Sequence, residues 1–245
     1  MQAVIVIPAR WGATRFPGKP LAPIAGETLI AHVIRRASAS HRATAVWVAT
    51  DDDRIAAEAE RCGARAAMPD GEFASGTDRI ATALRDIESS TGRTYDQIIN
   101  VQGDEPLLDV RSVDAMIAAL QATPAIDIAT LCCPLSNEDE YADPNVVKVV
   151  VDRAGDALYF SRAPIPSGGP GAAHRHIGVY GYQRAALLRF SALEPTPLER
   201  AERLEQLRAL ENGFTIRVLE TDAPHLGVDR PEDVRKIEQE LARLR

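Results

Sequence analysis

The chain begins with the segment AVIVIPARWGATRFPGKP, residues 3–20, in which an apolar run passes directly into a loop rich in glycine, proline and basic residues. A continuous apolar run bounded by turn residues is typical of a strand that is buried on both faces of a parallel sheet. Three cations, Arg10, Arg15 and Lys19, then lie just beyond the carboxyl end of this strand. Ligands of open α/β sheets bind at that edge. The segment therefore predicts an α/β fold with an anion-binding loop at one edge of its sheet.

The alternation of strand and helix continues along the chain. Helical periodicity over 28–39 is followed by a strand-like run over 45–49 and by a second helical pattern over 53–62. Such alternation indicates a mainly parallel sheet with helices on both faces. Further strands are expected over 3–7, 64–68, 97–101, 126–131, 177–182 and 215–220, and further helices over 77–88, 110–121, 184–190, 197–210 and from 231 onward.

Near residue 146 the alternation of strand and helix patterns gives way to two strand-like runs. These runs, 146–151 and 157–160, flank the turn sequence DRAGD and predict a β-hairpin. The segment 163–173 is dense in proline and glycine and is expected to form a loop. We therefore predict a single domain over 1–245 that contains a smaller lobe at about 140–212.

Composition limits the possible classes of function. A formal net charge of −7 gives no long-range attraction to nucleic acid or to an anionic membrane, so an anionic ligand needs a local basic cluster. The three cysteines form no Cys-x-x-Cys pair, the opening residues lack a basic signal region, and no stretch is long enough to span a bilayer. We expect a cytoplasmic protein that binds no nucleic acid and does not insert into membranes.

The basic loop is not a Walker motif. Five residues separate Gly12 from Gly18 instead of four, and Pro20 stands where a Ser or Thr would bind magnesium. Two interpretations of Arg10, Arg15 and Lys19 remain open from these residues alone. They either neutralise a triphosphate cradled by backbone N–H groups, or form a solvated basic loop.

Several acidic and polar residues also have two local interpretations. Asp104 follows a predicted buried strand and a glycine, so it either enters the crevice above the sheet or stabilises a turn. Asp229 precedes a predicted helix, as a capping residue does. Ser75 and Arg79 stand at a loop-to-helix junction, where a cap and a solvated first-turn residue are ordinary. The run 51–53 contains the Asp-x-Asp pattern of metal-dependent glycosyltransferases, but its position before a helix favours capping.

An ordered set of short strings resembles the signature of the 3-deoxy-manno-octulosonate cytidylyltransferase (CMP-Kdo synthetase) family. Each string alone is weak, but together they cover nearly the whole chain in order. The resemblance implies a three-layer, Rossmann-like nucleotidyltransferase fold with a mainly parallel sheet and a smaller inserted lobe for sugar binding and dimerisation. The strings are IPAR (7–10), TRFPGKPL (14–21), ATD (49–51), SGTDR (75–79), NVQGDEP (100–106), PNVVK (144–148), LYFSR (158–162), HIGVYGY (176–182), LEQLR (204–208) and GVDRPED (227–233).

The resemblance implies a specific reaction. Members of this family transfer CMP from CTP to the anomeric hydroxyl of 3-deoxy-D-manno-octulosonate (Kdo), which gives CMP-Kdo and pyrophosphate for lipopolysaccharide biosynthesis, and they are typically homodimers. The resemblance assigns Mg²⁺ to Asp104 and Asp229. This assignment suits the reaction, because attack on a triphosphate requires cations and Mg²⁺ prefers oxygen ligands. A cytidylyltransferase for 8-amino-Kdo or sialic acid is the nearest alternative, and a catalytically silent nucleotide-binding module is an alternative of another class.

The resemblance also implies the roles of individual residues. Taken alone, His176 on an apolar strand is more often a core histidine, and Glu205 a solvated helix residue. The loop 163–175 is shorter than in many relatives. The implied catalytic residues are Lys19, Arg10, Asp104 and Asp229; the nucleotide-binding residues are Ala9, Arg10, Arg15, Lys19, Ser75, Gly76, Arg79 and Gln102; and the sugar-binding residues are Arg162, His176, Tyr180, Glu205 and Gln206.

Overall fold

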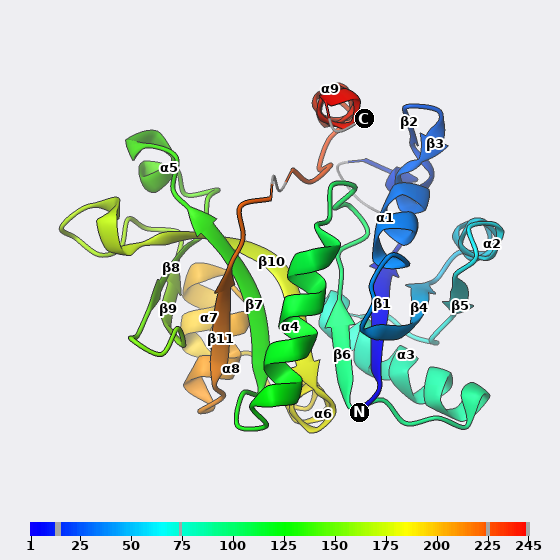
Figure 1. The fold of residues 1–245 in the computed structure, drawn as a ribbon, viewed down its shortest axis with the longest axis horizontal. Coiled ribbons are helices and arrows are strands. Elements are labelled where there is room, and N and C mark those ends of the chain that lie inside the picture. Colours follow the sequence, from blue (N-terminus) through cyan, green and yellow to red (C-terminus); the bar gives the residue numbers. More distant parts are fainter. Residues whose placement is uncertain (13–15, 74, 224–225, 244–245) are drawn as a thin grey trace. The chain divides into compact units, whose positions relative to one another are not determined.

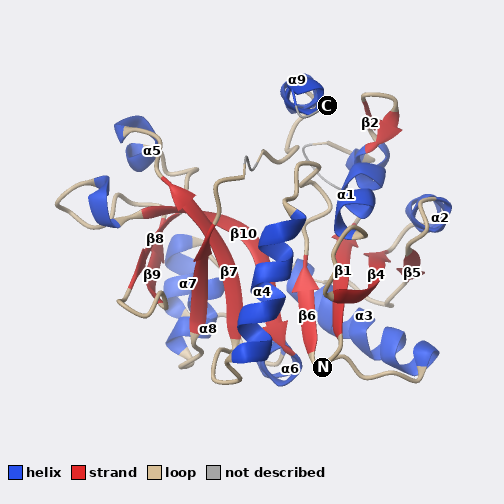
Figure 2. Ribbon diagram, in the orientation of Figure 1, coloured by secondary structure: helices blue, strands red, loops and turns tan. Residues whose placement is uncertain are grey.

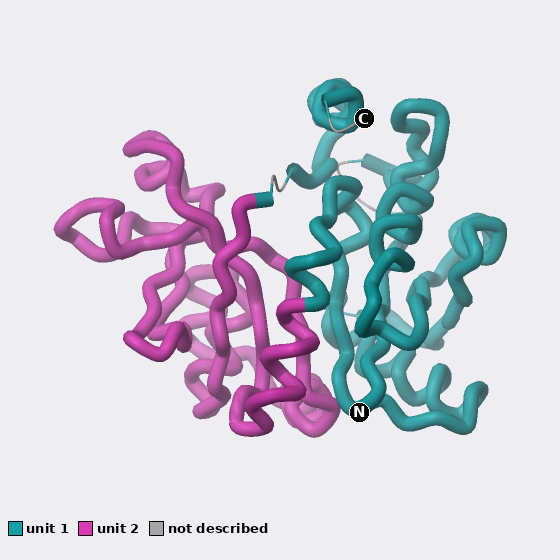
Figure 3. The backbone as a smooth tube through the Cα atoms, viewed as in Figure 1, with its two compact units in different colours: residues 1–114, 223–245 teal, residues 115–222 magenta. Residues whose placement is uncertain are grey.

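The structure, a computed structural model, describes residues 1–12, 16–73, 75–223 and 226–243 (Figure 1). The chain divides into two compact units (Figure 3). Unit 1 comprises residues 1–114 and 223–245, and unit 2 comprises residues 115–222. The whole of the predicted smaller lobe, 140–212, falls within unit 2. Among the described residues, no helix combines the length and apolar character needed to cross a membrane.

The sheet of unit 1 is parallel, as the alternation of strands and helices predicts. Its strand order is β6-β1-β4-β5. Residues 3–7 of the central strand are completely buried, which explains why this strand is a continuous apolar run rather than an alternating one. The strands are β1 (Ala3–Ala9), β4 (Ala43–Thr50), β5 (Arg65–Ala67) and β6 (Gln97–Asn100) (Figure 2).

Helices follow these strands, and capping residues set where several of them begin. The side chains of Thr28, Asp52 and Ser75 accept backbone N–H groups at the starts of three helices. These helices pack on the sheet through apolar positions spaced three or four residues apart. They are α1 (Leu29–Ala37), α2 (Asp53–Arg61) and α3 (Gly76–Thr91), while α4 (Val110–Ala122) crosses from unit 1 into unit 2.

A small hairpin that the sequence patterns did not predict lies between β1 and α1. It consists of β2 (Pro23–Ile24) and β3 (Glu27–Thr28), after the short 3₁₀ helix η1 (Lys19–Leu21). The last helix, α9 (Asp233–Arg243), begins two residues later than predicted. It packs against this hairpin. The buried residues of the shared cluster are Ile24, Leu29, Leu107, Val228, Ile237 and Leu241.

Unit 2 mixes parallel and antiparallel strands. Strand β7 (Ile128–Pro134) pairs in parallel with β11 (Ile216–Glu220) and antiparallel with β10 (His174–Gln183). The predicted hairpin is confirmed as β8 (Lys148–Val151) and β9 (Ala157–Ser161). The expectation of a mixed α/β, Rossmann-like fold with a mainly parallel sheet is thus confirmed.

One predicted helix of unit 2 is wrong. The pattern over 197–210 forms two short helices, α7 (Pro197–Glu202) and α8 (Gln206–Glu211). Arg203 has a positive φ of 56°, which ends α7 in the left-handed conformation and redirects the chain. Helix α6 (Arg184–Ser191) agrees with its prediction. The structure adds α5 (Glu138–Ala142) and a 3₁₀ helix, η2 (Pro170–Ala172), the latter inside the predicted loop 163–173.

Candidate active site

The candidate site lies at the carboxyl edge of the unit 1 sheet. Strand pairing places Ala9 of β1 beside Thr50 of β4, and Val6 of β1 beside Asn100 of β6. The segments that follow these three strands therefore leave the sheet at one edge. That edge is where ligands of parallel sheets bind.

A pocket of about 310 Å³ opens at this edge. It brings together every described residue that the sequence predicted for the nucleotide, together with both predicted metal-binding aspartates. Arg15, which was also predicted there, lies outside the described residues. The pocket is lined by Pro8, Ala9, Arg10, Phe16, Lys19, Pro20, Phe73, Ser75, Gly76, Arg79, Gln102, Gly103, Asp104 and Asp229.

Lys19 lies between the two aspartates. Its Nζ donates a hydrogen bond to Oδ2 of Asp104 at 2.7 Å and lies 4.0 Å from Oδ1 of Asp229. The lysine side chain is only 15% exposed, so this contact forms inside the pocket and not on an open surface. Two carboxylates that are distant in the sequence therefore face one cationic atom.

The backbone explains why these two aspartates meet. The N–H of Val228 donates to the carbonyl oxygen of Asp104 at 2.9 Å. Val228 is itself completely buried in the cluster formed by the hairpin and α9. Asp229 follows this anchored residue directly, so its side chain begins close to the Asp104 loop.

The carboxylate of Asp233, the first residue of α9, holds the segment that precedes the helix. Its Oδ2 accepts the N–H groups of Asp229 at 3.0 Å and of Arg230 at 2.9 Å. Asp229, which local patterns interpret as a cap and the resemblance assigns to Mg²⁺, lines the pocket and lies near the Lys19 ammonium.

The turn before Lys19 is held by close packing. Gly18 adopts a positive φ of 70° and donates its N–H to the carbonyl of Trp11 at 3.0 Å. A Cβ at Gly18 would lie 2.9 Å from the Trp11 ring, so both the conformation and the space require glycine. The guanidinium carbon of Arg54 lies 3.3 Å from the centroid of the Trp11 ring. Arg10 is exposed and lines the same pocket.

Arg79 lines the pocket and has a buried donor. One terminal nitrogen, Nη2, donates to Oδ2 of Asp51 at 2.9 Å, and the guanidinium carbon lies 5.0 Å from the centroid of the Phe73 ring. The other, Nη1, is buried and has no hydrogen-bond partner among the described residues. A buried charged donor without a partner is costly, which points to a ligand acceptor at this position.

Ser75 serves both as a cap and as a wall of the pocket. Its hydroxyl accepts the N–H of Asp78 at 3.2 Å at the start of α3, and Ser75 and Gly76 both line the pocket. Capping and a place in the pocket wall are therefore compatible at the start of α3.

The capping interpretation of the 51–53 run also agrees with the structure, because Asp52 accepts the N–H of Arg54 at 3.0 Å at the start of α2.

The loop that carries Asp104 approaches β1 very closely. A Cβ at Gly103 would lie 2.9 Å from the carbonyl oxygen of Pro8, so a larger residue would displace the loop. Gln102 donates through Nε2 to Oδ1 of Asn100 at 3.3 Å and lines the pocket. These contacts hold Asp104 above the end of the strand.

In unit 2, His176 is held as a neutral ring. Its Nε2 lies 3.0 Å from the hydroxyl oxygen of Thr130, and that hydroxyl points at the carbonyls of Ile177 and Val179 at 3.2 and 2.9 Å. Since the hydroxyl hydrogen serves a carbonyl, Nε2 of His176 is the donor to the oxygen and Nδ1 is the acceptor of the ring. Burial lowers the pKa of His176 to about 3.

The other predicted sugar-binding residues of the HIGVYGY and LEQLR strings lie near His176 or next to one another. The ring centroids of His176 and Tyr180 are 5.6 Å apart. Burial, and to a smaller extent the charges of Tyr182 and Glu205, raise the pKa of Tyr180 well above its usual value. Nε2 of Gln206 is buried and makes no hydrogen bond within the part of the chain that the structure describes. The structure thus gathers the neutral groups His176, Tyr180 and Gln206 with one carboxylate, Glu205, in unit 2.

Arg162 binds the protein backbone. Its Nε donates to the carbonyl of Glu202 at 2.9 Å and its Nη1 donates to the carbonyl of Pro144 at 3.1 Å. The completely buried Lys148 donates to the Arg162 carbonyl at 2.6 Å, and burial lowers the pKa of this lysine. These contacts make Arg162 part of the scaffold of unit 2.

Several residues of these sites were not predicted. Phe73 and Asp51 hold Arg79, Thr130 fixes the tautomer of His176, and Glu202 binds Arg162. Phe73 stands two residues before the SGTDR string, which is a signal that could have been used. The partnerships of Thr130 and Glu202 depend on contacts between segments far apart in the sequence, and no local pattern reveals them.

Comparisons with known proteins agree with this geometry. The family model described as "Cytidylyltransferase" matches residues 4–218. The 3-deoxy-manno-octulosonate cytidylyltransferase of Syntrophotalea carbinolica is 48% identical over 256 residues and covers 100% of both chains. The protein of the same name from Myxococcus xanthus is 49% identical over 242 residues, covering 97% of this chain and 95% of its own.

Solved structures give the same result. The structure of CMP:2-keto-3-deoxy-manno-octonic acid synthetase complexed with CTP has a TM-score of 0.92, is 40% identical, and covers 100% of both chains. A cytidylyltransferase from Leptospira borgpetersenii has a TM-score of 0.64 at 19% identity, covers 99% of this chain and 87% of its own, and supports the fold alone. The chain therefore belongs to the cytidylyltransferase family and, within it, to the 3-deoxy-manno-octulosonate cytidylyltransferases.

Proposed function

We propose that this chain transfers CMP from CTP to the anomeric hydroxyl of Kdo and releases pyrophosphate, which supplies CMP-Kdo for lipopolysaccharide biosynthesis. The observation that carries the proposal is the unit 1 pocket, which combines the Lys19, Asp104 and Asp229 cluster with the buried donor of Arg79. The first group suits a metal-bound triphosphate, and the second suits a base with acceptor atoms.

We propose that Asp104 and Asp229 bind Mg²⁺. The contacts of Lys19 support this fit, because its ammonium group already lies near both carboxylates as a cation would. Within the described ranges, no group of three or more His, Cys, Asp and Glu side chains is placed to hold a metal. Mg²⁺ keeps several waters and takes phosphate oxygens, so two carboxylates are sufficient protein ligands. When bound, the ion would neutralise charge on the phosphates.

The side chains of the basic loop then bind the triphosphate. Lys19 and Arg10 line the pocket and carry the positive charge that the phosphates require. With the phosphates held, the anomeric hydroxyl gives up its proton to solvent as its oxygen attacks the α-phosphorus in line, and the bond to the departing pyrophosphate breaks without a covalent enzyme intermediate. Positioning and charge stabilisation supply the catalysis.

Arg79 supplies base recognition in this proposal. Cytosine offers two adjacent acceptors, O2 and N3, whereas uracil carries an N–H at position 3. The buried Nη1 of Arg79 is a donor and cannot accept a hydrogen bond. Placed against N3, this donor favours cytosine over uracil, and the ion pair of Arg79 with Asp51 holds it in place.

The polar groups of unit 2, most of them neutral, bind the sugar acid in this proposal. Because the pKa of His176 is lowered to about 3, the ring is uncharged near neutral pH and accepts a sugar hydroxyl through Nδ1. The buried amide of Gln206 donates to an oxygen of the sugar acid. Tyr180 and Glu205 complete the binding groups, and Arg162 supports the lobe through its backbone contacts.

We further propose that the protein acts as a homodimer in the cytoplasm and binds no nucleic acid. The net charge of −7 supports the last point, because it repels polyanions. Light scattering on the purified protein should give twice the chain mass, and a monomer mass would overturn the dimer.

The reaction is tested by measuring pyrophosphate release from CTP. Kdo with Mg²⁺ should give turnover, and the same mixture with EDTA should give none. Sialic acid and 8-amino-Kdo, supplied in separate reactions, should be poorer substrates than Kdo. A protein that binds CTP but releases no pyrophosphate with any of these sugar acids would be a silent nucleotide-binding module, and the proposal would be wrong.

A further inference from the structure

The two aspartates of the pocket are held in different ways. The Asp104 side chain is 31% exposed and accepts a hydrogen bond from Lys19 at 2.7 Å, whereas the Asp229 side chain is 58% exposed and lies 4.0 Å from the ammonium. Packing restrains an exposed side chain weakly. The contacts that hold the Asp229 backbone therefore contribute to the direction of its carboxylate.

The Asp229 backbone is held from both sides. On its N-terminal side, the N–H of Val228 donates to the carbonyl of Asp104 at 2.9 Å. On its C-terminal side, one oxygen of Asp233 accepts two successive N–H groups, those of Asp229 at 3.0 Å and of Arg230 at 2.9 Å. Both hydrogen bonds end on Oδ2, so a single atom fixes two peptide groups.

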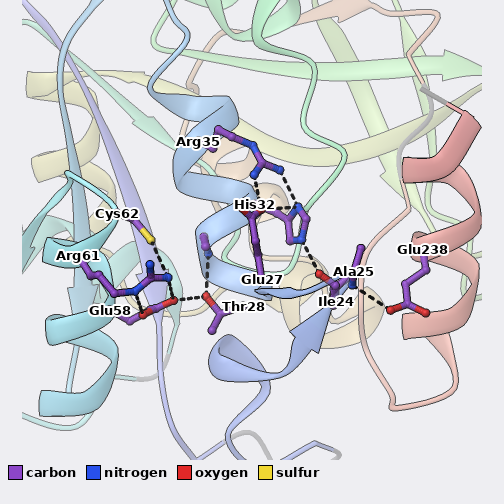
Figure 4. A network of polar contacts seen from close by, with 11 residues as sticks. Ile24, Ala25, Glu27, Thr28, His32, Arg35, Glu58, Arg61, Cys62 and Glu238 are labelled. Carbon is purple, nitrogen blue, oxygen red and sulfur yellow. Dashed lines mark hydrogen bonds and ion pairs between the residues drawn. The ribbon is translucent and has the colours of Figure 1, made fainter. Parts of the chain in front are cut away.

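Asp233 is itself mounted on an anchored helix. Glu238 of α9 accepts the N–H of Ala25 in the hairpin at 2.9 Å, and the buried ring of His32 lies 2.8 Å from the carbonyl of Ile24 (Figure 4). The apolar side of α9 joins the buried cluster beneath the same hairpin. The hairpin, α1 and α9 thus form one support for the Asp233 carboxylate.

We propose that Asp233 is a positioning residue for the metal site: it fixes the Asp229 peptide so that the Asp229 carboxylate faces the cation that Asp104 also binds. This inference rests on the proposed function, because it requires Asp229 to be a metal ligand. The positioning of the Asp229 peptide depends on the hydrogen bonds of Asp233 and not on its charge. The ion pair of Asp233 with Lys236 is 3.7 Å long, and the lysine side chain is 70% exposed.

The experiment measures how much Mg²⁺ increases the affinity for CTP. Calorimetric titration with CTP is done in Mg²⁺ and again in EDTA, and the ratio of the two dissociation constants is the metal-dependent gain. Asp233→Ala should lower this gain about tenfold, since groups that support metal ligands are commonly worth 10- to 100-fold. The affinity for CTP in EDTA should stay unchanged.

Two matched variants separate geometry from charge. Asp233→Asn should keep the gain, because its amide oxygen can accept the same two N–H groups. Lys236→Met removes the ion pair without touching the hydrogen bonds and should also keep the gain. Loss of the gain in Asp233→Asn would contradict the proposed hydrogen-bonding role. If Asp233→Ala fails to fold, Asp233→Gln, which moves the oxygen by one methylene, is measured in its place with the same expectation.

A reference variant distinguishes failure of the proposed metal site from failure of the positioning role of Asp233. Asp229→Asn should abolish the metal-dependent gain. If it does not, Asp229 is no metal ligand, and both the proposed metal site and this inference are wrong. If Asp229→Asn loses the gain while Asp233→Ala keeps it, the metal site stands and the positioning role of Asp233 is refuted.

Discussion

The pocket of unit 1 and the His176 cluster of unit 2 handle polar groups in opposite ways. In the pocket, Lys19, Asp104 and Asp229 bring full charges close together at a carboxyl edge of the sheet. In unit 2, polar groups are built into a row of rings whose neighbouring centroids are 4.9 to 6.4 Å apart. The row runs through Phe160, His176, Tyr180, Tyr182, Phe190 and Phe214.

This difference matches the chemistry that each region is proposed to serve. A triphosphate carries several negative charges, so its site must supply cations and metal-binding oxygens. A sugar is recognised by shape and by directional hydrogen bonds to its hydroxyls, which neutral groups in a rigid surround can provide. Substitutions in the first region should therefore act mainly on turnover and metal dependence, and those in the second on sugar affinity.

The largest effect is expected from Asp104→Ala. This change removes a proposed metal ligand and leaves Lys19 without its 2.7 Å partner, so turnover should fall at least about 100-fold. Steady-state pyrophosphate release at saturating CTP and Kdo measures the loss. Asp109→Asn is the matched control, because this carboxylate bonds Ser112 at the start of α4 and does not line the pocket. Near-normal turnover in Asp104→Ala would remove Asp104 from the metal site.

The next effect is expected from Arg79→Gln, on nucleotide choice. Loss of a charged donor commonly costs about 1.5–3 kcal/mol, so the affinity for CTP should fall roughly 10- to 100-fold. The affinity for UTP should change less, because uracil presents a donor where cytosine presents an acceptor. Arg65→Gln serves as the control, since Arg65 lies over Trp47 outside the pocket. Equal losses for CTP and UTP would show that Arg79 does not read the base.

Much of the unit 1 pocket could be predicted from sequence, for a physical reason. Its residues follow the ends of parallel strands, and pairing of β1 with β4 and β6 brings those ends to one edge. Local patterns could not predict that Asp229, which lies far along the chain from the other pocket residues, also reaches this pocket. That convergence depends on the Val228 N–H bond to the Asp104 carbonyl and on a buried cluster with an unpredicted hairpin.

Unit 2 was harder to predict because its polar groups depend on tertiary contacts. The charge state of His176 follows from burial and from Thr130 on a neighbouring strand, neither of which the HIGVYGY string contains. Arg162 matched a sugar-binding position by resemblance, yet its guanidinium donates to two backbone carbonyls. The break between α7 and α8 occurs at a left-handed arginine, a conformation that helical periodicity does not anticipate.

A smaller effect is expected from Gln206→Leu. Leucine keeps much of the volume but removes the buried amide donor, so the KM for Kdo should rise about 5- to 10-fold, in line with one neutral hydrogen bond. The affinity for CTP should not change, which tests the division of roles between the two regions. An unchanged KM for Kdo would exclude Gln206 from sugar binding.

The smallest effect is expected from the protonation of His176. Its pKa is about 3 in the folded protein and about 6.5 in the unfolded chain, so between these values only the unfolded chain binds the proton. Stability is therefore lost as the pH falls through 6.5 toward 3. Between pH 7 and pH 6 this group should contribute a loss of roughly 0.7 kcal/mol. Urea denaturation of the wild type and of His176→Gln at both pH values measures it.

The His176→Gln variant should show a pH dependence smaller by that amount, because glutamine does not titrate but its amide can still donate to Thr130. An identical pH dependence in both proteins would mean that the pKa of His176 is the same in the folded and the unfolded chain, so that the folded ring becomes charged near pH 6.5. The His176 cluster would then use a full charge, as the unit 1 pocket does, because a cationic His176 would pair with the carboxylate of the sugar acid. A neutral His176 requires instead that the KM for Kdo stay level between pH 6 and pH 8.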